Sequence, residues 1–307
     1  MNILITAGDV AGCSPALAAA LIEDRKPEET LTFVGPASLR GFLLDRLGAH
    51  RLGSGVEWVE VGQVEREQIF SAQPTETTGE NANRSLQRAL ELCQPGENSL
   101  LTLPLSKAVV QSAGYDDFVG HTERLEAFFD TDGVMTFFGD TMNVTLLTRH
   151  CPVDGISEVL NQNLVERTVR QVNEFYEKTY DGDFKFALLG LNPHAGEDGR
   201  IGTEDQTVLA PAVSTLRSDG IPIDGPHPAD SFVPVHGGDV NLIFACYHDQ
   251  GLVAFKQNHF FDGVHATLGL PIRRVSPDHG VALEGVKNGT VNPESALNCL
   301  QWLRDYR

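Results

Sequence analysis

Short apolar runs alternate with longer segments of helical periodicity in the first third of the chain. The apolar runs predict buried strands at residues 2–6, 31–34, 56–61 and 99–103. Apolar residues recur at helical spacing over residues 16–23, 38–47 and 80–93, and a helix is expected from Lys107 through residue 113. Residues 75–79 are expected to form a polar loop. This alternation is typical of an α/β fold with a parallel sheet.

The pattern changes after residue 133. Strands predicted at residues 134–138 and 143–148 are joined by a Gly139-Asp140 turn, which indicates an antiparallel pair. Residues 156–180 predict a long helical region with a break near residues 161–163. Further expected elements are strands at 185–190 and 241–246, a helix from Gln206, a proline-rich turn at 225–232 and a short helix at 298–307.

No repeat, low-complexity tract or long linker separates these two patterns. We therefore expect two interwoven α/β subdomains, one built from residues 1–123 and 265–307 and the other from residues 124–264. The length of 307 residues is sufficient for two cores.

Composition narrows the classes of partner and compartment. The formal net charge of -19 argues against a nucleic-acid partner, because binding to phosphates requires a basic surface. The five cysteines are odd in number and show no CxxC spacing, which favours reduced thiols over a disulfide framework. Without a leader pattern or a long apolar run, a soluble cytoplasmic protein with no membrane partner is expected.

Ionisable residues concentrate between residues 244 and 280, directly after the strand predicted at 241–246. The polar residues of this stretch include Tyr247, His248, Asp249, Gln250, Lys256, His265, Arg273, Arg274, Asp278 and His279. Ligands bind at the carboxyl ends of strands in open α/β sheets, so this stretch is the predicted centre of the functional site.

Three histidines directly follow predicted strands, namely His150, His194 and His248. Parallel strands would bring them to one edge of a sheet, where three imidazoles can hold a divalent metal with open coordination positions. The alternative is three unrelated loop histidines, since no local metal signature such as HExxH is present. Lys256 and Arg274 add positive charge, which favours a small anionic substrate.

Two further segments bear on ligand binding. The turn containing Gly8 and Gly12 lacks the GxGxxG pattern, so a Rossmann dinucleotide site is not predicted there. In GHTE, residues 120–123, either His121 or Thr122 could cap the following helix, whose amino terminus could bind an anion.

Five motifs together resemble the 4-hydroxythreonine-4-phosphate dehydrogenase family. They are GHTE (120–123), GLNPHAGEDGRIGTE (190–204), YHDQG (247–251) with Lys256, TLGLP (267–271) and DHG (278–280). The resemblance implies a fold similar to isocitrate and isopropylmalate dehydrogenases, with two interwoven α/β/α subdomains and an active site in the cleft between them. It also implies a homodimer whose active sites are shared, with residues 124–264 carrying the metal site and the dimer contact.

The resemblance also assigns roles to individual residues. His150, His194 and His248 match the family's metal ligands, with Zn²⁺ expected first and Mg²⁺ or Co²⁺ as alternatives. The residues matched to substrate contacts are His121, Thr122, Lys256, His265 and Arg274. Asp230 is expected to support them. The segment 278–296 resembles the superfamily's NAD or NADP loop, with Asp278, Gly280, Glu284 and Asn292 as its expected cofactor-binding residues.

The implied reaction is a metal-dependent, NAD(P)-linked oxidation of 4-hydroxy-L-threonine 4-phosphate, followed by decarboxylation, in pyridoxal phosphate biosynthesis. A catalytic base must take the hydroxyl proton. Lys256, Asp249 and His121 are the candidates, and the sequence leaves the choice open.

Two departures from the family pattern bear on the substrate. Ala7-Gly8-Asp9-Val10-Ala11-Gly12 replaces the family's usual Pro-Gly-Glu-Pro-Ala-Gly, and His265 replaces an asparagine that contacts substrate. One imidazole cannot present both the donor and the acceptor of an amide in a single orientation. Threonate or erythronate 4-phosphate and dihydrodiol carboxylates are therefore kept as alternative substrates.

Proteins of other classes also fit parts of the pattern. A metal-dependent hydrolase could use the same three histidines to activate water, without a nicotinamide cofactor. An acyltransferase of the same superfamily fold would need no metal triad, and a binding protein would catalyse no reaction.

Overall fold

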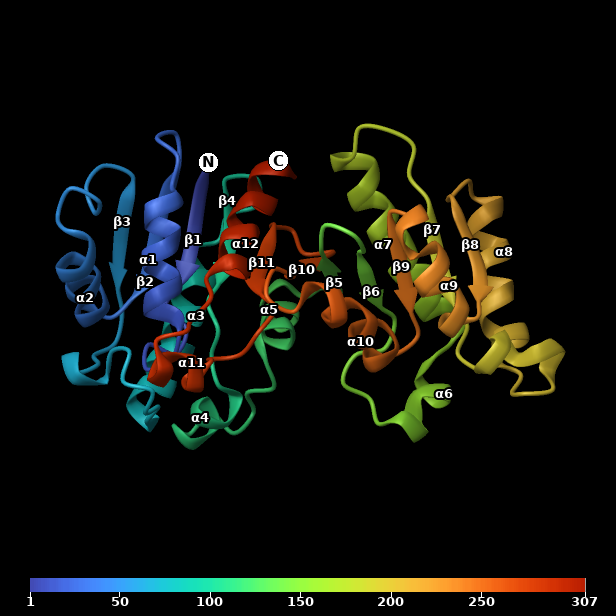
Figure 1. The fold of residues 1–307 in the computed structure, drawn as a ribbon, viewed down its shortest axis with the longest axis horizontal. Helices are drawn as coiled ribbons and strands as arrows, with labels where there is room; N and C mark the ends of the chain where they lie inside the picture. Colours follow the sequence, from blue (N-terminus) through green and yellow to red (C-terminus); the bar gives the residue numbers. More distant parts are fainter. Residues whose placement is uncertain (307) are drawn as a thin grey trace. The chain divides into compact units, whose positions relative to one another are not determined.

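The computed structural model describes residues 1–306, which form two compact units (Figure 1). Unit 1 consists of residues 1–133 and 270–305, and unit 2 of residues 134–269, with which Tyr306 also packs. The boundaries expected from the sequence fall inside helix α5 (His121–Phe129) and strand β10 (Val264–Leu268). The structure instead divides the chain between elements, because each helix or strand packs as a whole within one core.

Unit 1 contains a five-stranded parallel sheet in the order β3-β2-β1-β4-β11. Its strands are β1 (Asn2–Thr6), β2 (Thr30–Gly35), β3 (Val56–Glu60), β4 (Asn98–Thr102) and β11 (Arg274–Pro277). Its helices are α1 (Ser14–Asp24), α2 (Ala37–Leu47), α3 (Glu76–Leu92), α4 (Lys107–Ser112), α5, α11 (Leu283–Asn288) and α12 (Glu294–Asp305), with a short turn at Arg66–Gln68.

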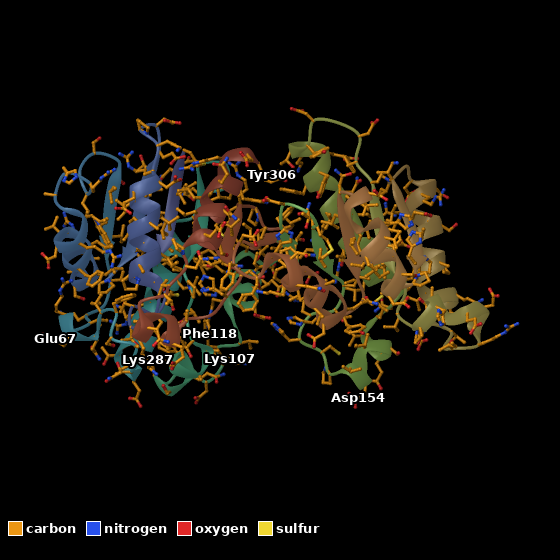
Figure 2. The ribbon with its side chains drawn as sticks, in the orientation of Figure 1. Glu67, Lys107, Phe118, Asp154, Lys287 and Tyr306 are labelled. Atoms are coloured by element: carbon orange, nitrogen blue, oxygen red, sulfur yellow. The ribbon has the colours of Figure 1, made fainter. Side chains whose placement is uncertain are left out.

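Helices cover both faces of this sheet. Leu4 of β1 packs with Leu86 of α3, Val110 of α4 and Phe118 in one apolar cluster. Phe118 is labelled in Figure 2. Side chains alternate along a strand, so Ile3 and Ile5 point to the other face, and both are fully buried. Helices α1 and α12 contact each other, and α12 also contacts β4 and β11. Unit 1 is thus a three-layer α/β/α unit.

Unit 2 contains a mixed six-stranded sheet in the order β10-β5-β6-β9-β7-β8. Its strands are β5 (Val134–Phe138), β6 (Val144–Leu146), β7 (Phe186–Leu189), β8 (Ile223–His227), β9 (Leu242–Ala245) and β10. Its helices are α6 (Ile156–Val159), α7 (Gln162–Thr179), α8 (Ala210–Ser218), α9 (Ala229–His236) and α10 (His248–His259), with short turns at Val153–Gly155, Pro193–Gly199, Asp205–Leu209 and Gly237–Asp239.

Strand direction divides this second sheet. Strand β5 pairs antiparallel with β6 and β10, as the Gly139-Asp140 turn predicted for the first pair. Strands β6, β9, β7 and β8 pair in parallel. One apolar cluster contains Phe137, Ile243 and Phe255 of α10, while α7 contacts β5 and β10 from outside this cluster. The predicted α/β class is confirmed, and the antiparallel pair lies where the sequence pattern changed.

Three predicted elements differ from the structure. Residues 75–79 are not a loop, because Thr75 caps α3: its hydroxyl accepts a bond from the Thr78 nitrogen at 3.3 Å. Residues 225–232 are not one turn, because they contain the end of β8 and the first half of α9. The final helix begins at Glu294 rather than at residue 298, and Arg307 of that prediction lies outside the described residues.

The helix break predicted near residues 161–163 is confirmed. Asn161 caps α7, and its side-chain oxygen accepts a bond from the Leu164 nitrogen at 3.0 Å. Within residues 1–306, no helix has both the length and the apolar composition that crossing a bilayer requires.

Candidate active site

The three strands that precede the predicted metal ligands are neighbours in unit 2. Strands β6, β9 and β7 lie side by side in that order and run parallel. His150 follows β6, His248 is the first residue of α10 after β9, and His194 follows β7. Their shared edge of the sheet is therefore the one predicted from the sequence.

His150 and His248 approach each other at this edge. Their ring centroids are 6.0 Å apart, with an angle of 40° between the ring planes. His248 Nδ1 lies 2.7 Å from Asp249 Oδ1, so the carboxylate accepts a hydrogen bond from the Nδ1–H group. This bond directs the lone pair of Nε2 outward, which is the usual arrangement of a histidine that binds a metal.

Hydrogen bonds between the strand ends fix these segments. The Thr148 hydroxyl donates to the Cys246 carbonyl at 2.7 Å, which ties the His150 segment to the end of β9. Gln250 accepts a bond from the Cys246 nitrogen and donates to the Gly190 carbonyl, both at 2.7 Å. The sequence did not identify Gln250 as a structural tie, because its partner lies 60 residues away.

His194 is exposed in the loop after β7 and does not join the other two histidines within one chain. Across the described residues 1–306, no group of three His, Cys, Asp or Glu side chains is arranged to hold a metal. The single chain thus brings together two of the three predicted ligands. The third ligand stays a prediction.

Unit 1 contains a buried cation of its own. Arg274 on β11 is 1% exposed, and its Nη2 donates to the Thr102 hydroxyl at 2.6 Å. Burial lowers the pKa of Arg274 to about 10, so the guanidinium is still charged at neutral pH. An always charged, rigid donor of this kind suits a phosphate or carboxylate.

The sequence suggested that His121 or Thr122 caps α5, but neither residue does so in the structure. Gly120 is the capping residue, no side chain makes the cap bond, and the two residues form the first turn of the helix instead. His121 Nε2 is buried without a hydrogen-bond partner. Burial, and then the charge of Arg274, lower the pKa of His121 to about 3. His121 is therefore a neutral imidazole that can bond to a ligand.

The remaining predicted substrate residues all lie in unit 2. Asp230 and Asp249 line one cavity of about 890 Å³ whose walls come mainly from α9 and α10. The Lys256 ammonium lies 5.7 Å from the centroid of the Phe260 ring. His265 stacks on Phe137, with centroids 4.9 Å apart and planes at 16°.

Comparison with known proteins decides the family. A family model described as "Pyridoxal phosphate biosynthetic protein PdxA" matches residues 37–303. The chain belongs to this family. A relative from Methylorubrum extorquens, named 4-hydroxythreonine-4-phosphate dehydrogenase, is 35% identical over 97% of this chain and 92% of its own length.

Solved structures agree with the fold. The 4-hydroxythreonine-4-phosphate dehydrogenase from Klebsiella pneumoniae has a TM-score of 0.80 at 28% identity, over 98% of this chain and 96% of that one. A terephthalate 1,2-cis-dihydrodiol dehydrogenase from Burkholderia xenovorans LB400 has a TM-score of 0.67 at 21% identity, over 99% and 97%. The second likeness concerns the fold alone. The predicted family is confirmed, and the names of its members indicate a dehydrogenase of pyridoxal phosphate biosynthesis.

The predicted cofactor segment of this PdxA-family chain is fastened to the first turn of unit 1. The Val281 carbonyl accepts a bond from the Cys13 nitrogen at 2.9 Å. A Cβ on Gly12 would lie 2.6 Å from the same carbonyl, which explains why a glycine is required there. The turn without a Rossmann pattern therefore supports the segment that the resemblance assigns to the cofactor.

The four predicted cofactor residues have different surroundings. The Asp278 nitrogen donates to the Ser295 hydroxyl at 3.1 Å, and the Gly280 carbonyl accepts a bond from the His279 ring. Glu284 pairs with Lys287 on α11 at 2.6 Å. The Asn292 side chain accepts a bond from the Glu294 nitrogen at 2.9 Å and so supports the start of α12. Their contact with a cofactor stays a prediction.

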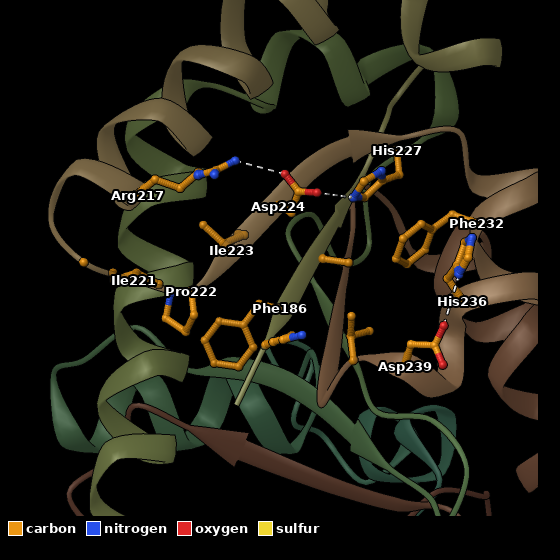
Figure 3. A pocket seen from close by; sticks show the side chains of 14 residues that line it. Phe186, Arg217, Ile221, Pro222, Ile223, Asp224, His227, Phe232, His236 and Asp239 are labelled. Carbon is orange, nitrogen blue, oxygen red and sulfur yellow. Dashed lines mark hydrogen bonds and ion pairs between the residues drawn. The ribbon is translucent and has the colours of Figure 1, made fainter. Parts of the chain in front are cut away.

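Unit 2 has a second hollow, of about 690 Å³, beside β8 (Figure 3). Five of its ionisable groups pair with one another: Asp224 lies 3.1 Å from Arg217 and 3.4 Å from His227, and His236 lies 3.1 Å from Asp239. None of the residues that the sequence assigned to the site lines this hollow. The candidate active site of the PdxA-family chain is therefore the edge that carries His150 and His248.

Proposed function

We propose that the chain oxidises 4-hydroxy-L-threonine 4-phosphate in a metal- and NAD(P)-dependent reaction with decarboxylation. One observation carries this proposal: the ring centroids of His150 and His248 lie 6.0 Å apart at neighbouring strand ends, and the Asp249 carboxylate orients the His248 ring. Membership of the PdxA family and the names of its relatives support the same reaction.

The donor set suits a divalent metal. His150, His194 and His248 would hold it, and the Asp249 carboxylate already fixes the His248 ring in the orientation that a ligand needs. When bound, the metal would polarise the substrate hydroxyl, and a nicotinamide would accept the hydride. Zn²⁺ is the first choice for three imidazoles, and Co²⁺ or Mg²⁺ are the alternatives.

Residues of unit 1 would bind the anionic parts of the substrate. Arg274 supplies a fixed positive charge, and the neutral His121 can donate or accept one hydrogen bond. Thr122, in the same helical turn as His121, adds a hydroxyl group. These residues orient the substrate and neutralise charge, and none of them needs to change protonation state.

The catalytic base would come from unit 2. With a pKa of about 3, His121 holds a proton too weakly to be an effective base near neutral pH. Asp249 is engaged with His248, so we propose Lys256, in its neutral amine form, as the base to test first. The base takes the hydroxyl proton as the adjacent carbon loses hydride, and the β-keto acid that forms then releases carbon dioxide.

We further propose a homodimer with shared active sites, because one chain gathers only two of the three ligands. In this arrangement His194 of one subunit would complete the pair formed by His150 and His248 of the other. Mixing inactive H194A and H248A subunits tests the idea directly. Random pairing would restore about a quarter of wild-type activity, because half of the dimers would have one intact site of two. No recovery would contradict a shared site.

The reaction itself is tested by following NADH or NADPH absorbance with 4-hydroxythreonine 4-phosphate, with and without a chelator. Turnover that stops with chelator and returns with Zn²⁺ or Co²⁺ would support the proposal. Threonate 4-phosphate, erythronate 4-phosphate and a dihydrodiol carboxylate belong in the same screen because the family resemblance assigns His265 to a substrate contact. Substrate consumption without cofactor reduction would favour a hydrolase instead.

A further inference from the structure

The loop that carries His194 has an unusual backbone. Residues 194–198 all have positive φ angles, of 55°, 50°, 81°, 42° and 56°. Only Gly196 in this run lacks a Cβ, and L-residues normally visit the left-handed region singly rather than in series. Such a conformation persists only where the surrounding structure holds it in place.

A buried carboxylate lies at the base of this left-handed turn. Asp205 is 1% exposed, and it begins the short helical turn that leads into α8. Its Oδ1 accepts a bond from the Leu191 nitrogen at 2.8 Å. Its Oδ2 accepts bonds from the Asn192 nitrogen at 3.2 Å and from the Asn192 side-chain amide at 2.8 Å. One side chain thus fixes both residues that lead into the turn.

The backbone closes tightly around this carboxylate. A Cβ on Gly190 would lie 2.7 Å from Asp205 Oδ1, and one on Gly196 would lie 3.2 Å from Oδ2. The Asn192 carbonyl in turn accepts a bond from the Ala195 nitrogen at 3.0 Å. The contacts therefore run without interruption from Asp205 to the backbone on both sides of His194.

We propose that Asp205 is a positioning residue for His194. Its carboxylate holds residues 191 and 192, these set the left-handed turn, and the turn sets the direction of the imidazole. The inference rests on the proposed function, in which His194 is a metal ligand. It adds that the ligand's geometry is imposed by a carboxylate that would touch neither metal nor substrate.

The Asp205→Asn substitution tests this role with little change of shape. An amide offers an N–H group where Asp205 now accepts a bond from a backbone N–H, so one contact is lost and a donor faces a donor. The Co²⁺ dissociation constant, measured by visible absorption, is expected to rise about 10- to 100-fold, as for other outer-shell partners of metal ligands. KM for the phosphorylated substrate is expected to change less than kcat.

Asp198→Asn is the matched control. Asp198 is an exposed carboxylate of the same loop, and asparagine tolerates its positive φ. This variant is expected to bind Co²⁺ as the wild type does. A tenfold weaker binding of Co²⁺ by Asp198→Asn would mean that any loss of charge in the loop weakens metal binding. That result would overturn the specific role of Asp205.

A rescue experiment separates positioning from general stability. Glycine enters the left-handed region without penalty, so adding Ala195→Gly and Glu197→Gly to Asp205→Asn should recover part of the lost Co²⁺ affinity. Loss of thermal stability in Asp205→Asn, with unchanged Co²⁺ affinity at a temperature where the variant is folded, would refute the inference. His194→Ala tells the two failures apart: if it too leaves Co²⁺ affinity unchanged, the proposed ligand set is wrong.

Discussion

His121 and His248 occupy opposite electrostatic surroundings. His121 has a buried Nε2 without a partner, and burial together with Arg274 disfavours its charged form. His248 is bonded to a carboxylate and lies near the surface. The first histidine is suited to hydrogen bonding as a neutral ring, and the second to binding a metal with a ring of fixed orientation.

The low pKa of His121 predicts an acid-sensitive contribution to stability. The pKa falls from 6.5 to about 3 in the folded chain, so below pH 6.5 the unfolded chain takes up a proton that the folded chain does not. Stability should therefore fall on acidification, by at most about 1.4 kcal/mol per pH unit between the two values. Thermal unfolding from pH 7 to pH 4 should decline more steeply in the wild type than in His121→Gln. Equal slopes would contradict the prediction.

His265 is predicted to influence which substrate is accepted. Its ring stacks on Phe137, so its orientation is restricted, and a single imidazole offers one donor and one acceptor along opposite directions. His265→Asn should raise kcat/KM for 4-hydroxythreonine 4-phosphate relative to the threonate, erythronate and dihydrodiol substrates. The full screen on both proteins measures this ratio. An unchanged substrate profile would show that residue 265 does not select the substrate.

Helix α10 depends on a glycine where it meets the sheet. A Cβ on Gly251 would lie 2.6 Å from Val144 Cγ1 and 2.9 Å from the Ala245 Cβ. Three residues earlier, the same helix presents His248. Close packing of α10 on β6 and β9 therefore fixes the position of the proposed ligand.

Gly251→Ala should be destabilising although alanine favours helices. Overpacking of this contact should cost about 1–3 kcal/mol, which exceeds the gain in helix propensity of up to about 1 kcal/mol. Activity should fall as well, because α10 must move away from the sheet. Gly41→Ala in α2 is the control: apart from its chain neighbours and the helix's own backbone, no atom lies within 4 Å of its Cβ, so it should stabilise the protein. Chemical denaturation of both variants measures the difference.

Much of the element pattern could be predicted from local sequence. Strands β1, β2 and β4 are buried apolar runs, and the break before α7 follows from the capping side chain of Asn161. Strand β8 and α9 were missed because Gly225, Pro226 and Pro228 indicate a turn. The strand forms nonetheless because its partner β7 is distant in sequence, and the Gly190 nitrogen donates to the His227 carbonyl.

The same distinction applies to the candidate site. His150, His194 and His248 could be proposed as ligands because each follows a predicted strand, which is a local signal, and the structure brings the rings of His150 and His248 together. The structural roles of Asp205 and Gln250 could not be predicted, because their partners lie 13–14 and 60 residues away along the chain. The low pKa of His121 depends likewise on burial and on Arg274, which only the folded chain brings near it.

At the scale of the whole molecule, the last helix is joined to the first thirty residues by charge. The Arg304 guanidinium bonds to Glu29 through Nε at 2.7 Å and Nη2 at 2.9 Å, and to Asp24 through Nη1 at 2.7 Å. The Glu29 side chain is fully buried. Burial alone would raise the pKa of Glu29, but the bonds from Arg304 lower it.

Arg304→Met should therefore strongly destabilise unit 1. Removing the cation leaves Glu29 buried without its partner, which typically costs about 3–5 kcal/mol. Arg170→Met removes an exposed pair with Asp219 and should cost far less, because solvent screens a pair of this kind. Calorimetric unfolding of the two variants provides the comparison. Similar losses of stability in both variants would show that the buried contact contributes no more to folding than the exposed one.

The split composition of unit 1 has a consequence during synthesis. Strand β4 is flanked by β1 and by β11, whose residues are made 172 positions after β4 ends. At ribosomal speeds of about 5–20 residues per second, the edge of β4 stays uncovered for roughly 10–30 s, while the contiguous residues 134–269 emerge and can fold. An open strand edge recruits other chains, so the nascent polypeptide is most prone to aggregation in that interval.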